Sequence, residues 1–118
     1  MTVQEIANGL VQACRGGKFE EAYTNYFSKD AKSIEPMGEN PVTEGLDNMF
    51  AKAAGWATTT EMHGCEVSDP IIAGNYFTTK FILDSTNKET KKRTQSEELA
   101  LYHVKDGKIV SEQFFYDM

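Results

Sequence analysis

Residues 96–118, SEELALYHVKDGKIVSEQFFYDM, decide the expected fold, because they have the pattern of two strands joined by one tight turn. The turn is expected at Asp106-Gly107, since this pair tolerates the positive backbone angles of a short hairpin. Successive side chains of a strand point to opposite faces. One face is expected to carry Glu98, Ala100, Tyr102, Val104, Val110, Glu112, Phe114 and Tyr116. The other is expected to carry Leu99, Leu101, His103, Ile109, Gln113 and Phe115. Both faces are partly apolar, which favours a sheet covered on one side and curved around a pocket on the other.

The composition is that of one globular domain over residues 1–118, because a chain of this length can bury a substantial core. The formal net charge of −6 disfavours binding to nucleic acid. No apolar run reaches the length that crosses a bilayer, so no membrane partner is expected. Residues 1–17 lack a basic start followed by an apolar block, which favours a cytoplasmic protein.

The sequence predicts neither a metal site nor a cofactor. Cys14 and Cys65 lie far apart without the paired spacing of a zinc site, and the two histidines have no ligand spacing. Glycine-rich phosphate-binding patterns are also absent from the sequence, so a nucleotide cofactor is not expected.

The order of expected elements is helix, helix, strand, helix, and then four strands joined by hairpins. The ranges are helices at 2–15, 18–27 and 44–56 and strands at 30–36, 58–68, 71–84, 90–104 and 109–116. Thr2 is expected to cap the first helix together with Glu5, Thr43 is expected to cap the third, and residues 85–88 are expected to form a turn. This order predicts an α+β fold in which a strongly bent antiparallel sheet curls around the third helix and leaves a cavity open at one end.

Three segments in this order resemble the nuclear transport factor 2-like superfamily, and specifically its SnoaL-like branch. They are AxxxGKFEEAYTNYFSKDAKSIEP at residues 13–36, Gly45 at the start of the third helix, and VKDGKIVSEQFFYD at residues 104–117. The resemblance covers almost the whole chain and implies a cone-shaped α+β barrel, the ketosteroid isomerase-like fold, which often dimerises through its exposed sheet. Members of the superfamily include isomerases, dehydratases, polyketide cyclases, epoxide hydrolases and non-catalytic binding modules, so the fold alone does not give the function.

Ser33-Ile34-Glu35-Pro36 is similar to the segment that carries the general base of ketosteroid isomerases, so the resemblance places Glu35 in that role. Those isomerases also use two hydrogen-bond donors to the developing oxyanion. The matching positions here are Leu10 and Ala100, whose side chains donate nothing. The familiar steroid isomerase mechanism is therefore not expected.

The same alignment places Ala100 toward the cavity, and the alternation then predicts a mainly aromatic pocket with several acids. Its expected ligand-binding residues are Met49, Trp56, Glu98, Glu112, Phe114 and Tyr116, and its catalytic candidates are Glu35, His63 and Tyr102. Five of these residues have a structural alternative. Glu35 could face solvent, Glu98 and Glu112 could lie at a solvated rim, Trp56 could pack in the core, and His63 could be a structural hydrogen-bonding group.

Two functions remain open on the sequence. The first is a cofactor-free isomerase or lyase that binds a small apolar molecule, with Glu35 as the base and Tyr102, Tyr116 or His63 as the donor. The second is a non-catalytic module that acts through the surface of a homodimer.

Overall fold

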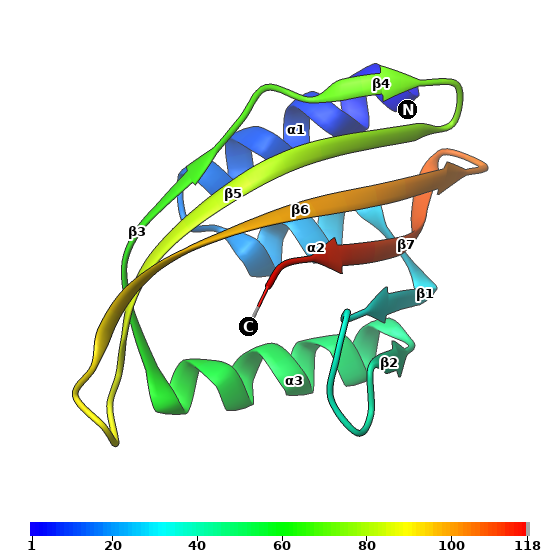
Figure 1. Ribbon diagram of the computed structural model, residues 1–118. Coiled ribbons are helices and arrows are strands. Elements are labelled where there is room, and N and C mark those ends of the chain that lie inside the picture. The colour runs from blue at the N-terminus through cyan, green and yellow to red at the C-terminus, as the bar shows by residue number, and fades with distance from the viewer. Residues whose placement is uncertain (118) are drawn as a thin grey trace.

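The helices and strands of the computed structural model, which describes residues 1–117, follow the expected order with two short strands added (Figure 1). The helices are α1 (Val3–Arg15), α2 (Phe19–Tyr26) and α3 (Leu46–Thr59). The strands are β1 (Phe27–Ile34), β2 (Val42–Glu44), β3 (Thr60–Val67), β4 (Ile71–Ala73), β5 (Tyr76–Asn87), β6 (Arg93–Lys105) and β7 (Lys108–Phe115). No helix within residues 1–117 is both long and apolar enough to cross a membrane.

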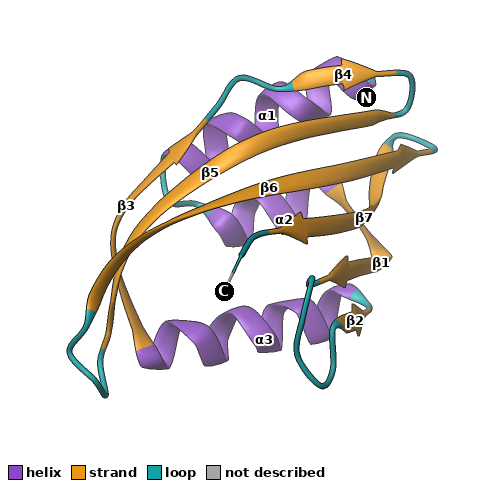
Figure 2. Cartoon of the chain, in the orientation of Figure 1, coloured by secondary structure: helices purple, strands orange, loops and turns teal. Residues whose placement is uncertain are grey.

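The strands form one curved sheet in the order β2-β1-β7-β6-β5-β3, with β4 also paired to β5. The expected α+β class is confirmed, and the three helices lie along one side of the sheet (Figure 2). The expectation of a wholly antiparallel sheet is wrong at one pair, because β1 and β7 run parallel. Since β2 and β3 are the two ends of this order, the sheet does not close into a complete barrel.

The hairpin of β6 and β7 turns where the sequence predicts, with positive φ angles of 52° at Asp106 and 76° at Gly107. Its register contains a bulge that simple alternation does not foresee. Val104 pairs with Ile109 and His103 pairs with Ser111, so β7 holds one extra residue between them. Ile109 is consequently fully buried, and its expected place on the outer face is wrong.

Several element boundaries differ from the expected ones. Phe27 begins β1 instead of ending α2, because its backbone is extended. Residues 85–87 continue β5, so the expected turn lies further on, at residues 88–90, where the Asn87 side chain accepts from two backbone N–H groups. The three-residue strands β2 and β4 are too short to give a periodic signal.

The core forms between α1, α2 and the sheet. Thr2 and Glu5 make the expected reciprocal cap of α1, and the residues of this helix that are buried are Ile6, Ala7, Leu10, Val11 and Cys14. Gly9, on α1, lies against the Tyr26 side chain of α2, and a Cβ atom at Gly9 would collide with that ring. The two helices thus approach each other more closely than a larger residue would allow.

α3 is the least buried of the long elements. It begins after Gly45, whose φ of 88° favours glycine, and no side chain caps it, so the expected cap by Thr43 is wrong. The helix extends to Thr59, three residues further than expected. Only Met49 of α3 is buried, because this helix meets the strands of the sheet mainly at β1, β2 and β3. Ala53, Trp56 and Ala57 of this helix border a cavity.

Candidate functional site

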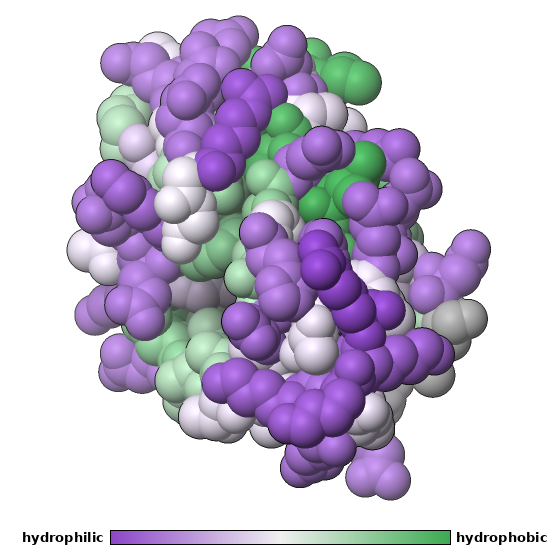
Figure 3. All heavy atoms as spheres, turned by 90° about the vertical axis from the view of Figure 1, so that its left-hand side faces the viewer, coloured by the Kyte–Doolittle hydropathy of each residue, from purple (hydrophilic) through white to green (hydrophobic). Residues whose placement is uncertain are grey.

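A cavity of about 1470 Å³ lies between α3 on one side and α1, α2 and the curved sheet on the other. On the face of the molecule drawn in Figure 3, apolar side chains reach the surface between polar ones. Every residue that the sequence nominates for the site borders this cavity: Glu35, Met49, Trp56, His63, Glu98, Tyr102, Glu112, Phe114 and Tyr116. The roles assigned to them stay predictions, whereas their common position is a feature of the structure.

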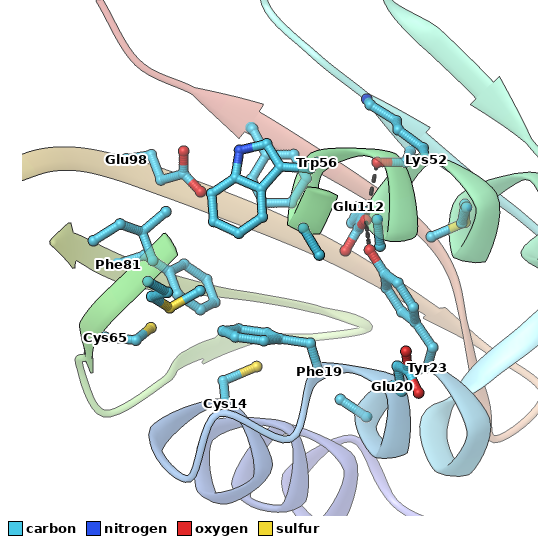
Figure 4. Close-up of a pocket in the computed structure, with 18 of the residues that line it drawn as sticks. Cys14, Phe19, Glu20, Tyr23, Lys52, Trp56, Cys65, Phe81, Glu98 and Glu112 are labelled. Atoms are coloured by element: carbon cyan, nitrogen blue, oxygen red, sulfur yellow. Dashed lines mark hydrogen bonds between the residues drawn. The ribbon is translucent and has the colours of Figure 1, made fainter. Parts of the chain in front are cut away.

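Glu112, on β7, is the most deeply buried acid of the cavity wall, with 3% of its surface exposed. Its Oε1 atom accepts hydrogen bonds from Ser33 Oγ at 2.9 Å and from the Tyr23 hydroxyl at 3.2 Å (Figure 4). Burial raises the pKa of Glu112 to about 7, and the two hydroxyl donors offset part of that rise. The alternative of a solvated rim position is therefore wrong for Glu112.

The two oxygens of Glu112 have different surroundings. Both hydroxyl donors point at Oε1, and no hydrogen bond reaches Oε2 from the part of the chain that the structure describes. Because an oxygen that accepts two hydrogen bonds is a poor place for a proton, the protonated carboxyl carries its hydrogen on Oε2. Glu112 thus has one anchored oxygen and one oxygen free to exchange a proton.

Tyr23 and Ser33 are site residues that the sequence reasoning missed. Ser33 lies on β1, and Glu35 directly follows that strand, so extending the alternation by one residue would have placed both on one face. Tyr23 lies in α2, and nothing in the sequence of that helix distinguishes it from a core aromatic residue. Its ring also packs edge-on against Phe27 and Phe50, which fixes the hydroxyl beneath Glu112.

Glu35 also faces the cavity, although its surroundings are more polar. Its Oε2 accepts from the Tyr116 hydroxyl at 2.7 Å, and its Oε1 accepts from Lys52 Nζ at 3.2 Å. The side chain is 22% exposed, so the alternative of an acid directed into bulk solvent is wrong. Partial burial, followed by the bond to Glu35, raises the pKa of Tyr116 to about 12. Lys52 was missed by the sequence reasoning, although it lies one helical turn before Trp56.

Glu98, on β6, is the third acid that the sequence nominates for the site, and it is partly exposed. Burial, and then the charge of Glu35, raise the pKa of Glu98 to about 7. In Figure 4 the Glu98 carboxylate and the indole of Trp56 both point into the cavity, from β6 and α3 respectively. Trp56 is 43% exposed, so the alternative of core packing is wrong for this residue.

Tyr102 and His63 differ in how free their polar atoms are. Tyr102 is 2% exposed and stacks on Phe77 with ring centroids 4.7 Å apart, yet no hydrogen bond within residues 1–117 reaches its hydroxyl. Burial raises the pKa of Tyr102 well above its usual value. His63 is exposed, and its Nε2 shares a hydrogen bond of 2.7 Å with Thr86 Oγ1 on β5. One ring nitrogen of His63 is thus engaged in a hydrogen bond with a neighbouring strand, as the structural alternative predicts.

The wall contains acids but no arrangement suited to a metal ion. Across residues 1–117, no three His, Cys, Asp or Glu side chains converge in a way that would hold one. Cys14 and Cys65 also border the cavity, and burial raises the pKa of the first thiol to about 12 and of the second to about 11. Both thiols are therefore poor nucleophiles at neutral pH.

Comparison with known proteins gives a family model and a set of similar structures. The model of the SnoaL-like domain matches residues 1–116. A protein of Mesorhizobium loti is 35% identical to this chain. It is provisionally assigned as a SnoaL-like polyketide cyclase, and the words "carbohydrate phosphatase" accompany that assignment. It has a TM-score of 0.94 over 98% of this chain and 100% of that chain. Among curated proteins, none matches the chain.

Two more distant structures share the fold. A protein of Catenulispora acidiphila with a ketosteroid isomerase-like fold, in complex with trimethylamine, is 17% identical. Its TM-score is 0.77 over 97% of this chain and 86% of that chain. A protein of Xanthomonas campestris with a cystatin-like fold is 15% identical, with a TM-score of 0.81 over 100% of this chain and 92% of that chain.

Proposed function

Since the chain belongs to the SnoaL-like domain family, we propose that it binds a small, mainly apolar molecule in the cavity under α3 and transfers a proton on it. It would act as an isomerase or lyase without a cofactor. The observation that carries the proposal is Glu112, a fully buried carboxyl group with a pKa of about 7 and one oxygen free of partners. An acid or base with a pKa near the working pH is the most effective in proton transfer.

The proposed step uses the free oxygen of Glu112. In an isomerisation, Oε2 takes a proton from a carbon next to a carbonyl group and returns it to another carbon, so the composition of the substrate is unchanged. In a dehydration, Oε2 takes a proton from the carbon next to the carbonyl group. It then gives that proton to the departing hydroxyl group of the substrate, which leaves as water. Ser33 and Tyr23 hold the other oxygen throughout, which keeps the carboxyl group in one orientation.

Tyr102 is the proposed donor to the developing oxyanion. The hydroxyls of Tyr23 and Tyr116 already donate to carboxylates, whereas that of Tyr102 is not engaged by any of residues 1–117. A buried donor of this kind stabilises negative charge more strongly than water does. This assignment would supply one of the two donors that Leu10 and Ala100 do not provide.

Glu35, the base implied by the resemblance, has a weaker case. Each of its oxygens already accepts one hydrogen bond, from Tyr116 and from Lys52, so Glu35 has no oxygen that is free of donors from residues 1–117, as Oε2 of Glu112 is. We infer that Glu35 instead supplies negative charge near Glu112 and Glu98, since it helps to raise the pKa of both.

The relatives are compatible with this class of function. The Mesorhizobium loti protein carries a provisional cyclase assignment, and the Catenulispora acidiphila protein binds a small organic molecule. Either observation supports a ligand cavity in this fold, and neither identifies the ligand of this chain.

Native mass spectrometry of the purified protein, followed by identification of any retained molecule, is the first test. The second is the exchange of α-protons of apolar ketones such as 2-tetralone in D2O, followed by ¹H NMR. Glu112→Gln should slow the exchange by at least about 100-fold, because it removes the proton-transfer group. Glu97→Gln should leave the exchange unchanged, since Glu97 is exposed and pairs with Lys80. An unchanged rate in the Glu112 variant would contradict the proposal.

The non-catalytic alternative rests on the outer face of the sheet. Large apolar side chains are exposed there at Tyr76, Leu99 and Phe115, and Leu99 lies opposite Phe115 in the pairing of β6 with β7. We propose that a second copy of the chain covers this face, because exposed apolar patches commonly mark interfaces. Leu99→Glu should convert a dimer to a monomer in sedimentation experiments, whereas Val42→Glu, at an exposed site on β2, should not. A wild-type protein that sediments as a monomer would contradict this proposal.

A further inference from the structure

Glu98 is less satisfied than Glu35 and Glu112, the other two acids that the sequence nominates for the site. Glu112 and Glu35 each accept hydrogen bonds from two side chains. No hydrogen bond or ion pair within residues 1–117 reaches the Glu98 carboxylate, although that side chain is partly buried. A partly buried carboxylate without a partner is unfavourable, so this position favours a ligand that brings a cation or a donor.

Trp56 gives the second half of the argument. Its indole extends from α3 into the cavity that Glu98 enters from β6 (Figure 4). Trp56 is 43% exposed, so much of its surface is available to a ligand. The negative face of an indole attracts cations most strongly among the aromatic side chains. A carboxylate and an indole on one cavity wall are therefore complementary to an ammonium group on an apolar body.

The charges around the cavity point the same way. The acids that border it are Glu20, Glu21, Glu35, Glu39, Glu98 and Glu112, and the bases are Arg15, Lys18 and Lys52. Two of the three bases are already paired, Arg15 with Asp69 and Lys52 with Glu35. The surplus of negative charge disfavours an anionic ligand and favours a cationic one.

We propose that the ligand carries a protonated amine, and that the carboxylate of Glu98 and the indole of Trp56 bind this amine. This inference rests on the proposed function, because it assumes that the cavity holds a small apolar molecule. It adds the chemical class of that molecule and separates two tasks. Glu98 binds the cationic group, and Glu112 acts on another part of the same ligand.

Binding of an amine has a consequence for protonation. A cation next to Glu98 favours the ionised carboxylate, so the amine should bind less tightly as the pH falls through about 7. The titratable groups that face Glu98 are Glu35 after β1, Cys65 on β3, Tyr102 on β6 and Tyr116 after β7. Glu112 borders the same cavity and also has a pKa of about 7, so the pH dependence of binding in the wild-type protein must be compared with that in Glu98→Gln to separate the two acids.

The test uses three probes with the same apolar body: 1-adamantanemethylamine, 1-adamantanemethanol and 1-adamantanecarboxylate. Trp56 is the only tryptophan, so its fluorescence reports binding directly, and none of the probes absorbs in its range. At pH 8 the amine should bind about tenfold more tightly than the alcohol, and the carboxylate should bind most weakly.

Variants and pH then assign the preference to Glu98. Glu98→Gln should bring the affinity for the amine down to that for the alcohol, whereas the adjacent control Glu97→Gln should keep the preference, because Glu97 pairs with Lys80. In the wild-type protein, lowering the pH from 8 to 6 should weaken amine binding several-fold and leave alcohol binding unchanged. The comparison of the three probes in the wild-type protein needs no substitution, so it holds even if a variant folds poorly.

Equal affinities for the amine and the alcohol would overturn the inference, as would a preference that survives Glu98→Gln or the absence of binding by all three probes. Binding of the alcohol alone would leave the proposed function in place, since the cavity would still accept an apolar molecule. The loss of proton exchange in Glu112→Gln tests that function separately.

Discussion

α1 and α3 have similar lengths, 13 and 14 residues, but they contribute differently to the molecule. Five residues of α1 are buried, whereas α3 buries only Met49. Most apolar side chains of α1 fill the core, whereas Ala53, Trp56 and Ala57 of α3 border the cavity. The difference shows that an apolar stripe predicts which side of a helix faces inward without telling whether protein atoms or a ligand will cover it.

The largest expected effect on stability comes from a buried residue of α1. Ile6→Ala should lower the free energy of unfolding by about 3–4 kcal/mol, because Ile6 is fully buried and its removal leaves a void. Urea denaturation followed by circular dichroism measures this change. A loss below about 1 kcal/mol would mean that α1 is as loosely packed as α3.

Glu112 lies on the wall of the cavity and should make the free energy of unfolding depend on pH. Its pKa rises from 4.5 to about 7 on folding, so the folded protein holds this proton more tightly than the unfolded chain. The stabilisation is complete below pH 4.5 and is lost as the pH rises through 7, which amounts to about 3 kcal/mol. The wild-type stability minus that of Glu112→Gln, measured by urea denaturation from pH 4.5 to 8, isolates this contribution. A difference that stays constant with pH would contradict the prediction.

The starts of the two helices should respond unequally to similar substitutions. Thr2→Ala removes the reciprocal cap of α1 and should cost about 1 kcal/mol. Thr43→Ala should cost less than about 0.5 kcal/mol, because Thr43 caps nothing and α3 begins after Gly45. Thermal denaturation of both variants gives the comparison, and equal losses would restore Thr43 as a cap.

The smallest expected effect on stability is at Trp56. Trp56→Ala should change the free energy of unfolding by less than about 0.5 kcal/mol, since nearly half of the ring is exposed. The same substitution should weaken binding of 1-adamantanemethylamine about tenfold in isothermal titration calorimetry. If stability falls as far as in Ile6→Ala, the ring is packed in the core rather than available to a ligand.

Local signals in the sequence account for much of the fold. The Asp106-Gly107 turn and the cap at Thr2 each depend on neighbouring residues, and each lies where the sequence predicts. The parallel pairing of β1 with β7 joins segments distant in sequence and has no local signature. The bulge in β7 is also invisible to alternation, which is why Ile109 was expected on the outer face.

The candidate site shows the same division. The alternation of β6 and β7 correctly directs Glu98, Tyr102 and Glu112 to one cavity. Alternation does not show that Glu112 accepts hydrogen bonds from hydroxyl groups of α2 and β1, because those contacts join segments that are distant in the sequence. The resemblance implies Glu35 as the base, and in the structure each oxygen of Glu35 accepts one hydrogen bond from a neighbouring side chain.

The contact between Gly9 and Tyr26 has a consequence for how such a protein can diversify. α2 also carries Tyr23, so the spacing of the first two helices sets the height of the hydroxyl beneath Glu112. A methyl group at position 9 would collide with the Tyr26 ring, so that ring would have to move and the packing of α2 against α1 would change. Gly9 does not border the cavity, so a substitution outside the site can in this way affect the hydrogen bond that Tyr23 donates to Glu112.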